Sequence, residues 1–121
     1  LEYEVQLEGI DAPEVKQQYG DKASEALSKM IKGKEVTVKW KSKDDYQRIL
    51  GQVYQNESWI NLEMLKAGMA WHYKRYNKDT ELAEAESAAK ASSQGLWSTS
   101  QPEAPWEYRK KNRNAEKETS K

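Results

Sequence analysis

The hydrophobic pattern of this chain changes period near residue 21, and that change restricts the fold to one that mixes strands with helices. Residues 1–8 alternate strictly, with apolar side chains at the odd positions and Glu or Gln at the even ones. A period of two is typical of a strand with one buried face. From about Asp21 the apolar residues recur every three or four positions and Gly33 follows them. This spacing predicts a helix that stops at the glycine.

The rest of the chain predicts further strands and two more helices. Alternation over residues 36–40 and an apolar run over 49–54 predict two strands joined by a polar loop, with a short pairing segment at 59–60. Residues 62–65 predict a short helix, residues 71–73 an extended piece, and residues 80–95 a last helix. About three helices among these strands predict an α+β barrel with its helices at one end.

The length of 121 residues suits one domain with a single modest core. We place the domain at residues 1–98 and a C-terminal tail at 99–121. In that tail Trp106 and Tyr108 are expected to pack back on the body, and the basic end is expected to be disordered. No apolar run approaches the roughly 20 residues of a membrane helix, so no membrane span is expected. The lack of cysteine excludes a disulfide scaffold.

The net charge of zero hides a split between the body and the tail. Residues 109–121 carry six basic and two acidic side chains, a net charge of +4, whereas the rest carries 14 basic and 18 acidic ones, a net charge of −4. A body of that sign does not attract polyanions through its overall field, so nucleic acid would have to bind at a local patch. The basic tail is a second candidate contact, although short mixed-charge ends are usually only solvated.

Five separated blocks, in order along nearly the whole chain, resemble the staphylococcal nuclease family. They are VQLEGIDAPE at 5–14, YG at 19–20 before a helix, DDYQRILG at 44–51, the segment from Asn61 to Trp71, and the closing GLW and PWEYR at 95–97 and 105–109. The resemblance implies a five-stranded OB-fold β-barrel. It also implies a nuclease that hydrolyses phosphodiester bonds of DNA or RNA with calcium and prefers single strands.

This chemistry explains the residue types in the blocks. Negative charge grows on the phosphoryl oxygens in the transition state, so a cation and guanidinium donors are needed there. Arginine offers phosphate a planar fork of donors that never loses its charge. A carboxylate is needed to orient or deprotonate the attacking water.

The resemblance assigns roles by position. Asp11 matches a calcium ligand and Ala12 offers its backbone carbonyl, a set of oxygen donors that suits calcium. Glu14 matches the general base or positioner of the water, and Arg48 matches one of two catalytic arginines. The expected nucleotide contacts are Tyr46, Tyr73 and Tyr76.

Structural readings of the same residues stand beside these roles. An Asp and a Glu flanking a proline are commonly turn residues, Arg48 near Asp44 can form a plain surface ion pair, and the tyrosines can be rim packing. The lone His72 is expected to be a surface or packing residue rather than a catalyst.

The chain departs from the family at two points. Gln6 stands where the family has its other catalytic arginine, and by analogy with an oxyanion-hole donor such a loss costs on the order of 10²–10³ in rate. The chain also opens on what the family treats as its third strand, without the first hairpin and its further calcium ligand. Because that leaves an open sheet edge, we expect either that the natural protein supplies the hairpin or that a second chain, such as another copy, covers the edge.

Three functions remain open on these grounds: a weakened calcium-dependent nuclease, a catalytically silent OB-fold module that binds single-stranded nucleic acid by stacking, and a protein-interaction module. Retention of Asp11, Glu14 and Arg48 favours the first, and Gln6 favours the second. The choice between DNA and RNA is left open. Family habit favours a secreted or cell-envelope location.

Overall fold

The structure is a computed structural model that describes residues 3–119, with side chains to residue 113. Its strands are β1 (Val5–Leu7), β2 (Ile10–Asp11), β3 (Thr37–Lys43), β4 (Ile49–Gln55), β5 (Ser58–Trp59) and β6 (Trp71–His72). Its helices are α1 (Gly20–Ile31), α2 (Ile60–Lys66), α3 (Thr80–Ala91) and α4 (Pro105–Thr119), with a 3-10 turn, η1, at Gly95–Ser98. The predicted α+β class is therefore confirmed.

Strand β4 is the centre of the main sheet. It pairs with β3 antiparallel and with β1 parallel, and its far end pairs with β5. Strands β2 and β6 form a separate antiparallel pair, in which Asp11 faces Trp71. Within residues 3–119 both sheets are open, so the expected closed five-stranded barrel is not confirmed.

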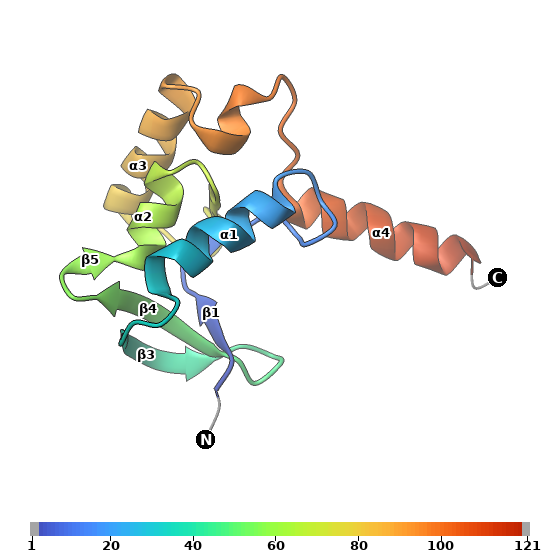
Figure 1. The fold of residues 1–121 in the computed structure, drawn as a ribbon. Coiled ribbons are helices and arrows are strands. Elements are labelled where there is room, and N and C mark those ends of the chain that lie inside the picture. Colours follow the sequence, from blue (N-terminus) through green and yellow to red (C-terminus); the bar gives the residue numbers. More distant parts are fainter. Residues whose placement is uncertain (1–2, 120–121) are drawn as a thin grey trace.

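The core lies between the main sheet and helices α1, α2 and α3, which Figure 1 shows stacked above it. Alternate residues of β4 point inward, and Ile49 and Val53 are buried. Most residues of helix α2 are buried, and the helix packs on α3, α1 and β4. Its Leu65, with Leu82 of α3, is completely buried. Strand β1 and the loop after it are therefore held to the core through the pairing of β1 with β4.

Beside the core, the main sheet keeps an open apolar groove of about 300 Å³. Its lining side chains are Tyr3, Val5, Val38, Trp40 and Ile49. Exposed apolar surface of this kind agrees with the open sheet edge expected from the sequence. The expectation that another segment or chain covers it stays a prediction.

The segment after η1 differs from the expected irregular tail, because helix α4 begins at Pro105. Proline suits the first turn of a helix, where its missing N–H costs nothing. Figure 1 shows α4 leaving the body on the side where the loop before α1 lies. The division of the chain at residue 98 remains a prediction, and part of the basic end lies outside the described residues. Within those residues, no helix is long and apolar enough to span a membrane.

Candidate active site

The candidate catalytic segment, residues 8–19, follows strand β1 and contains β2. The buried side chain of Asn61 holds its start in place. The Asn61 side chain donates to the carbonyl oxygens of Glu8 at 2.9 Å and Gly51 at 3.1 Å, and it accepts from the N–H of Val53 at 3.0 Å. Asn61 is completely buried. One amide thus ties the start of the loop to strand β4.

The other end of the loop is held by Gln17 and Gly20. Gln17 is buried; its Oε1 accepts from the N–H of Glu14 at 3.0 Å, and its Nε2 donates to the carbonyl of Glu103 at 2.5 Å. A Cβ atom at Gly20 would lie 2.1 Å from the carbonyl oxygen of Glu14, so only glycine fits. The backbone at Glu14 is therefore fixed by contacts on both sides.

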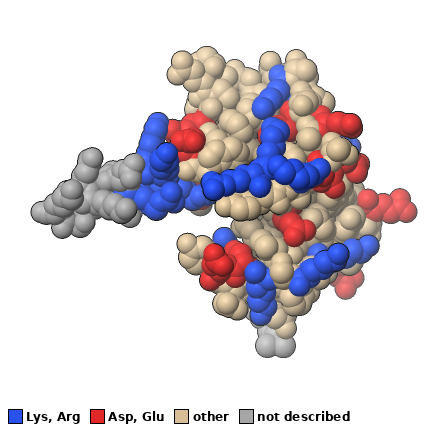
Figure 2. Space-filling view, turned by 180° about the vertical axis from the view of Figure 1, so that it is seen from behind, with Lys and Arg blue, Asp and Glu red and all other residues tan. Residues whose placement is uncertain are grey.

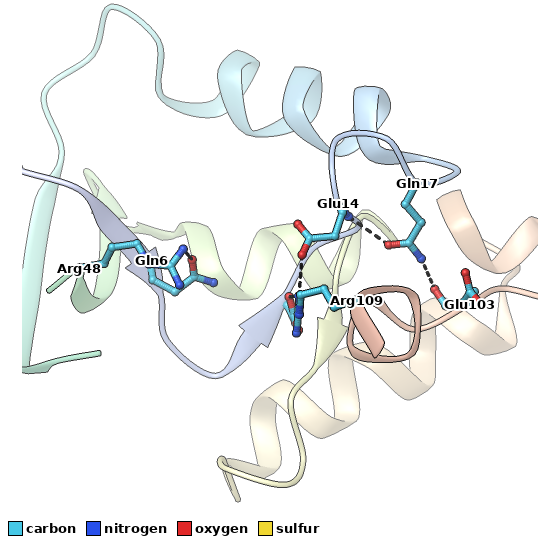
Figure 3. Close-up of polar contacts among 7 residues, drawn as sticks. Gln6, Glu14, Gln17, Arg48, Glu103 and Arg109 are labelled. Carbon is cyan, nitrogen blue, oxygen red and sulfur yellow. Dashed lines mark hydrogen bonds and ion pairs between the residues drawn. The ribbon is translucent and has the colours of Figure 1, made fainter. Parts of the chain in front are cut away.

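Asp11 and Glu14 come together on this loop around the guanidinium of Arg109, which reaches them from α4 (Figure 3). Nη2 of Arg109 donates to Oδ2 of Asp11 at 2.6 Å. Its Nη1 donates to Oδ1 of Asp11 at 3.2 Å and to Oε1 of Glu14 at 3.0 Å. Asp11 is 7% exposed, whereas the Glu14 side chain is 38% exposed. Water can therefore reach Glu14 but hardly Asp11.

The charges of this cluster interact strongly. Burial raises the pKa of Asp11 above its ordinary value and outweighs the hydrogen bond and charge of Arg109, while Glu14 raises that pKa further and Arg48 lowers it. Hydrogen bonds to Asp11 and Glu14 hold the pKa of Arg109 above its ordinary value.

Arg48 is positioned by the loop that precedes β4. Its Nε donates to Oδ2 of Asp44 at 2.7 Å, and its Nη1 donates to Oε1 of Gln6 at 3.1 Å. The surface ion pair with Asp44 that the sequence predicts therefore exists. Arg48 also contacts Gln6 of β1, the position where the resembled family has its other catalytic arginine. Within the described residues, Glu14 and Arg48 share no hydrogen bond or ion pair.

The three tyrosines separate into two places. Tyr46 is 80% exposed and lies beside the guanidinium of Arg48. Tyr73 stacks on Trp106 of α4 at 5.3 Å, and Tyr76, 70% exposed, meets Tyr73 edge to face. Tyr73 and Trp106 line an open cavity of about 360 Å³, whose other lining residues are Trp71, His72, Lys74, Arg75 and Glu107. His72 itself is buried, consistent with a packing role.

The oxygen donors of the loop suit calcium in kind but not in number. The carboxylates of Asp11 and Glu14 and the carbonyl of Ala12 are the hard ligands that calcium prefers, and calcium takes about six to eight of them. In the described part of the chain, no three His, Cys, Asp or Glu side chains gather into a metal-binding group. These residues could therefore form one side of a calcium shell.

Sequence reasoning missed two residues of this site. Arg109 belongs to the closing PWEYR block, and nothing in the local sequence indicates that it reaches residues near the start of the chain. Gln17 reads as an ordinary polar loop residue although it is buried. Figure 2 shows Lys and Arg side chains crossing the face of the body beside α4, with Asp and Glu side chains among them.

Comparison with known proteins places these features in context. A family model described as staphylococcal nuclease homologue matches residues 4–99. A probable staphylococcal-like nuclease, CAN3, of Oryza sativa subsp. japonica is 44% identical over 93% of this chain and 30% of its own length. The staphylococcal-like nuclease CAN1 of Arabidopsis thaliana is also 44% identical, over 92% of this chain and 34% of its own. An uncharacterized endonuclease of Escherichia coli is 42% identical, over 87% of this chain and 69% of its own. The chain thus spans about a third of the length of these plant relatives.

Proposed function

Because the chain belongs to the staphylococcal nuclease homologue family, we propose that it is an endonuclease that hydrolyses phosphodiester bonds of single-stranded DNA or RNA with the help of calcium. The observation that carries the proposal is the convergence of Asp11 and Glu14 on one anchored loop with a guanidinium between them. The relatives named as nucleases support the reaction class.

In this proposal Glu14 is the general base. Its carboxylate is accessible, and Gln17 fixes the backbone that carries it. Glu14 takes a proton from a water molecule whose oxygen then bonds to phosphorus, while the bond to the leaving sugar oxygen breaks and that oxygen takes a proton from solvent. Arg48 meets the negative charge that grows on the phosphoryl oxygens, because its guanidinium remains charged at any working pH.

Calcium would be held by the carboxylate of Asp11 and the carbonyl of Ala12. When bound, it would supply positive charge next to the phosphoryl oxygens. Because burial raises the pKa of Asp11, calcium would compete with a proton for this carboxylate. Tyr46, Tyr73 and Tyr76 are proposed to contact the nucleotide, the two exposed tyrosines by stacking on bases.

The test is cleavage of a fluorescent single-stranded oligonucleotide, with calcium and with EGTA, by the wild-type chain and by Glu14→Gln. Glu25→Gln is the matched control, because Glu25 is an exposed glutamate on α1. We expect calcium-dependent cleavage that Glu14→Gln abolishes and Glu25→Gln leaves intact. Absence of cleavage by the folded wild-type chain, with oligonucleotide binding retained, would instead favour a silent binding module.

A further inference from the structure

The Arg109 guanidinium has donors left over after it has bound both carboxylates. An arginine carries five N–H donors. Three of them serve Asp11 and Glu14, two from Nη1 and one from Nη2. Within the described residues, Nε and the second N–H of Nη2 make no hydrogen bond, and the side chain is 33% exposed. Arg109 can therefore accept an anion while it keeps its present contacts.

The same guanidinium is held more firmly than a surface arginine. Helix α4 is attached to the body through Trp106, which stacks on Tyr73, and through the Gln17 bond to the Glu103 carbonyl just before the helix. The paired hydrogen bonds to Asp11 fix the plane of the guanidinium. A donor fixed before the substrate arrives loses little entropy when it binds, which is the condition for effective charge stabilisation.

Strand β1 lacks such a donor. Gln6 has a neutral amide, and its Oε1 accepts from Arg48. In Figure 3 Gln6 and Arg48 lie toward one end of the β1–β2 segment, and Glu14 and Arg109 lie toward the other. Glu14, the proposed general base, thus has a guanidinium beside it that comes from α4 rather than from β1.

We propose that Arg109 is a catalytic residue that binds the phosphoryl oxygens of the substrate through Nε and Nη2, and that it supplies the guanidinium charge that is absent at Gln6. The expected effect of Arg109 on the cleavage rate rests on the proposed nuclease function. Its expected effect on oligonucleotide binding does not. Arg109 offsets part of the charge of Asp11 and Glu14, whereas the charge of Arg48 is already paired with Asp44.

The experiment compares Arg109→Gln, Arg109→Lys and the control Lys111→Gln, which removes a cation of the same helix that pairs with Glu103. Single-turnover cleavage of a single-stranded DNA oligonucleotide in calcium is measured for each variant. We expect Arg109→Gln to lower the rate by about 10²–10³, the scale of a lost charge-stabilising donor, and Arg109→Lys to keep part of it. Lys111→Gln should cleave like the wild type. A melt followed by circular dichroism shows whether each variant is folded.

The decisive variant is Gln6→Arg added to Arg109→Gln. If Arg109 supplies the charge that β1 lacks, the added arginine restores at least about tenfold of the lost rate, although it cannot restore the contacts of α4. A rate that rises in Arg109→Gln would show that Arg109 blocks the site, and a normal rate with a lower melting temperature would show a structural link only. Either result overturns the proposal.

Binding in EGTA separates this inference from the proposed function. Fluorescence anisotropy with the same oligonucleotide should show about tenfold weaker binding for Arg109→Gln than for Lys111→Gln, with a smaller salt dependence. If the wild type binds in this way but does not cleave, the nuclease proposal fails and phosphate binding by Arg109 stands. Equal binding by the two variants would refute it.

Discussion

Replacing Asn61 with alanine is expected to destabilise the fold by about 3 kcal/mol, because two buried or partly buried backbone groups then lose their partner. The N–H of Val53 is buried and would be left unpaired, at a cost of about 2 kcal/mol. The carbonyl of Glu8 is partly buried and can recruit water, so its loss costs about 1 kcal/mol. The carbonyl of Gly51 keeps the N–H of Glu8 at 2.9 Å and adds little.

For a domain of this size, a loss of about 3 kcal/mol lowers the melting temperature by roughly 12 °C. The assay is thermal unfolding followed by circular dichroism, with urea unfolding as a second measure. Glu63→Gln, on the same helix, is the matched control because it removes only an exposed ion pair with Lys66. A melting temperature for Asn61→Ala equal to that of the control would refute the account of how β1 and its loop are anchored.

Three further outcomes are expected. Arg48→Lys keeps the charge but loses the planar fork, so oligonucleotide cleavage should slow by about 10²-fold while the melting temperature stays close to that of the wild type. Burial alone would raise the pKa of Glu86, but the hydrogen bond from Lys74 and other partners outweigh that effect, so this pKa lies below its ordinary value of 4.5. At neutral pH the wild type should therefore be about 1–3 kcal/mol more stable than Glu86→Gln. This difference should shrink when urea unfolding is repeated at pH values below about 4.5. Burial raises the pKa of Asp11 despite Arg109, so the wild type loses stability as pH rises above 3.8. The stability of Asp11→Asn relative to the wild type should therefore increase from acid to neutral pH, while its cleavage activity is lost. Paired melts and cleavage assays would show both effects.

Local patterns were sufficient to predict most elements. The three- and four-residue spacing before Gly33 placed α1 within a residue or two, and the apolar run over residues 49–54 placed β4. Strand β3 extends to Lys43, further than predicted, because its last residues are exposed and polar and are strand only through pairing with Ile49 and Leu50. Such a segment carries no hydrophobic period from which it could be recognised.

The carboxylates of the site were predictable and their main partner was not. Asp11 and Glu14 lie three residues apart in a proline-containing loop, so their proximity follows from the chain itself. Arg109 reaches them only because Trp106 stacks on Tyr73 and α4 begins at Pro105. A helix of mostly charged residues gives little indication of which side chain points inward.

The central claim is that Glu14 directs water onto a phosphodiester, and the most direct test is cleavage of a single-stranded DNA oligonucleotide in water enriched in oxygen-18. Mass spectrometry then follows the phosphate at the new ends. Attack by water predicts that each cleavage in calcium places one heavy oxygen on that phosphate, and that Glu14→Gln, purified in the same way, yields almost no labelled ends. Labelled ends formed equally fast by Glu14→Gln, or cleaved ends without the label, would contradict the account.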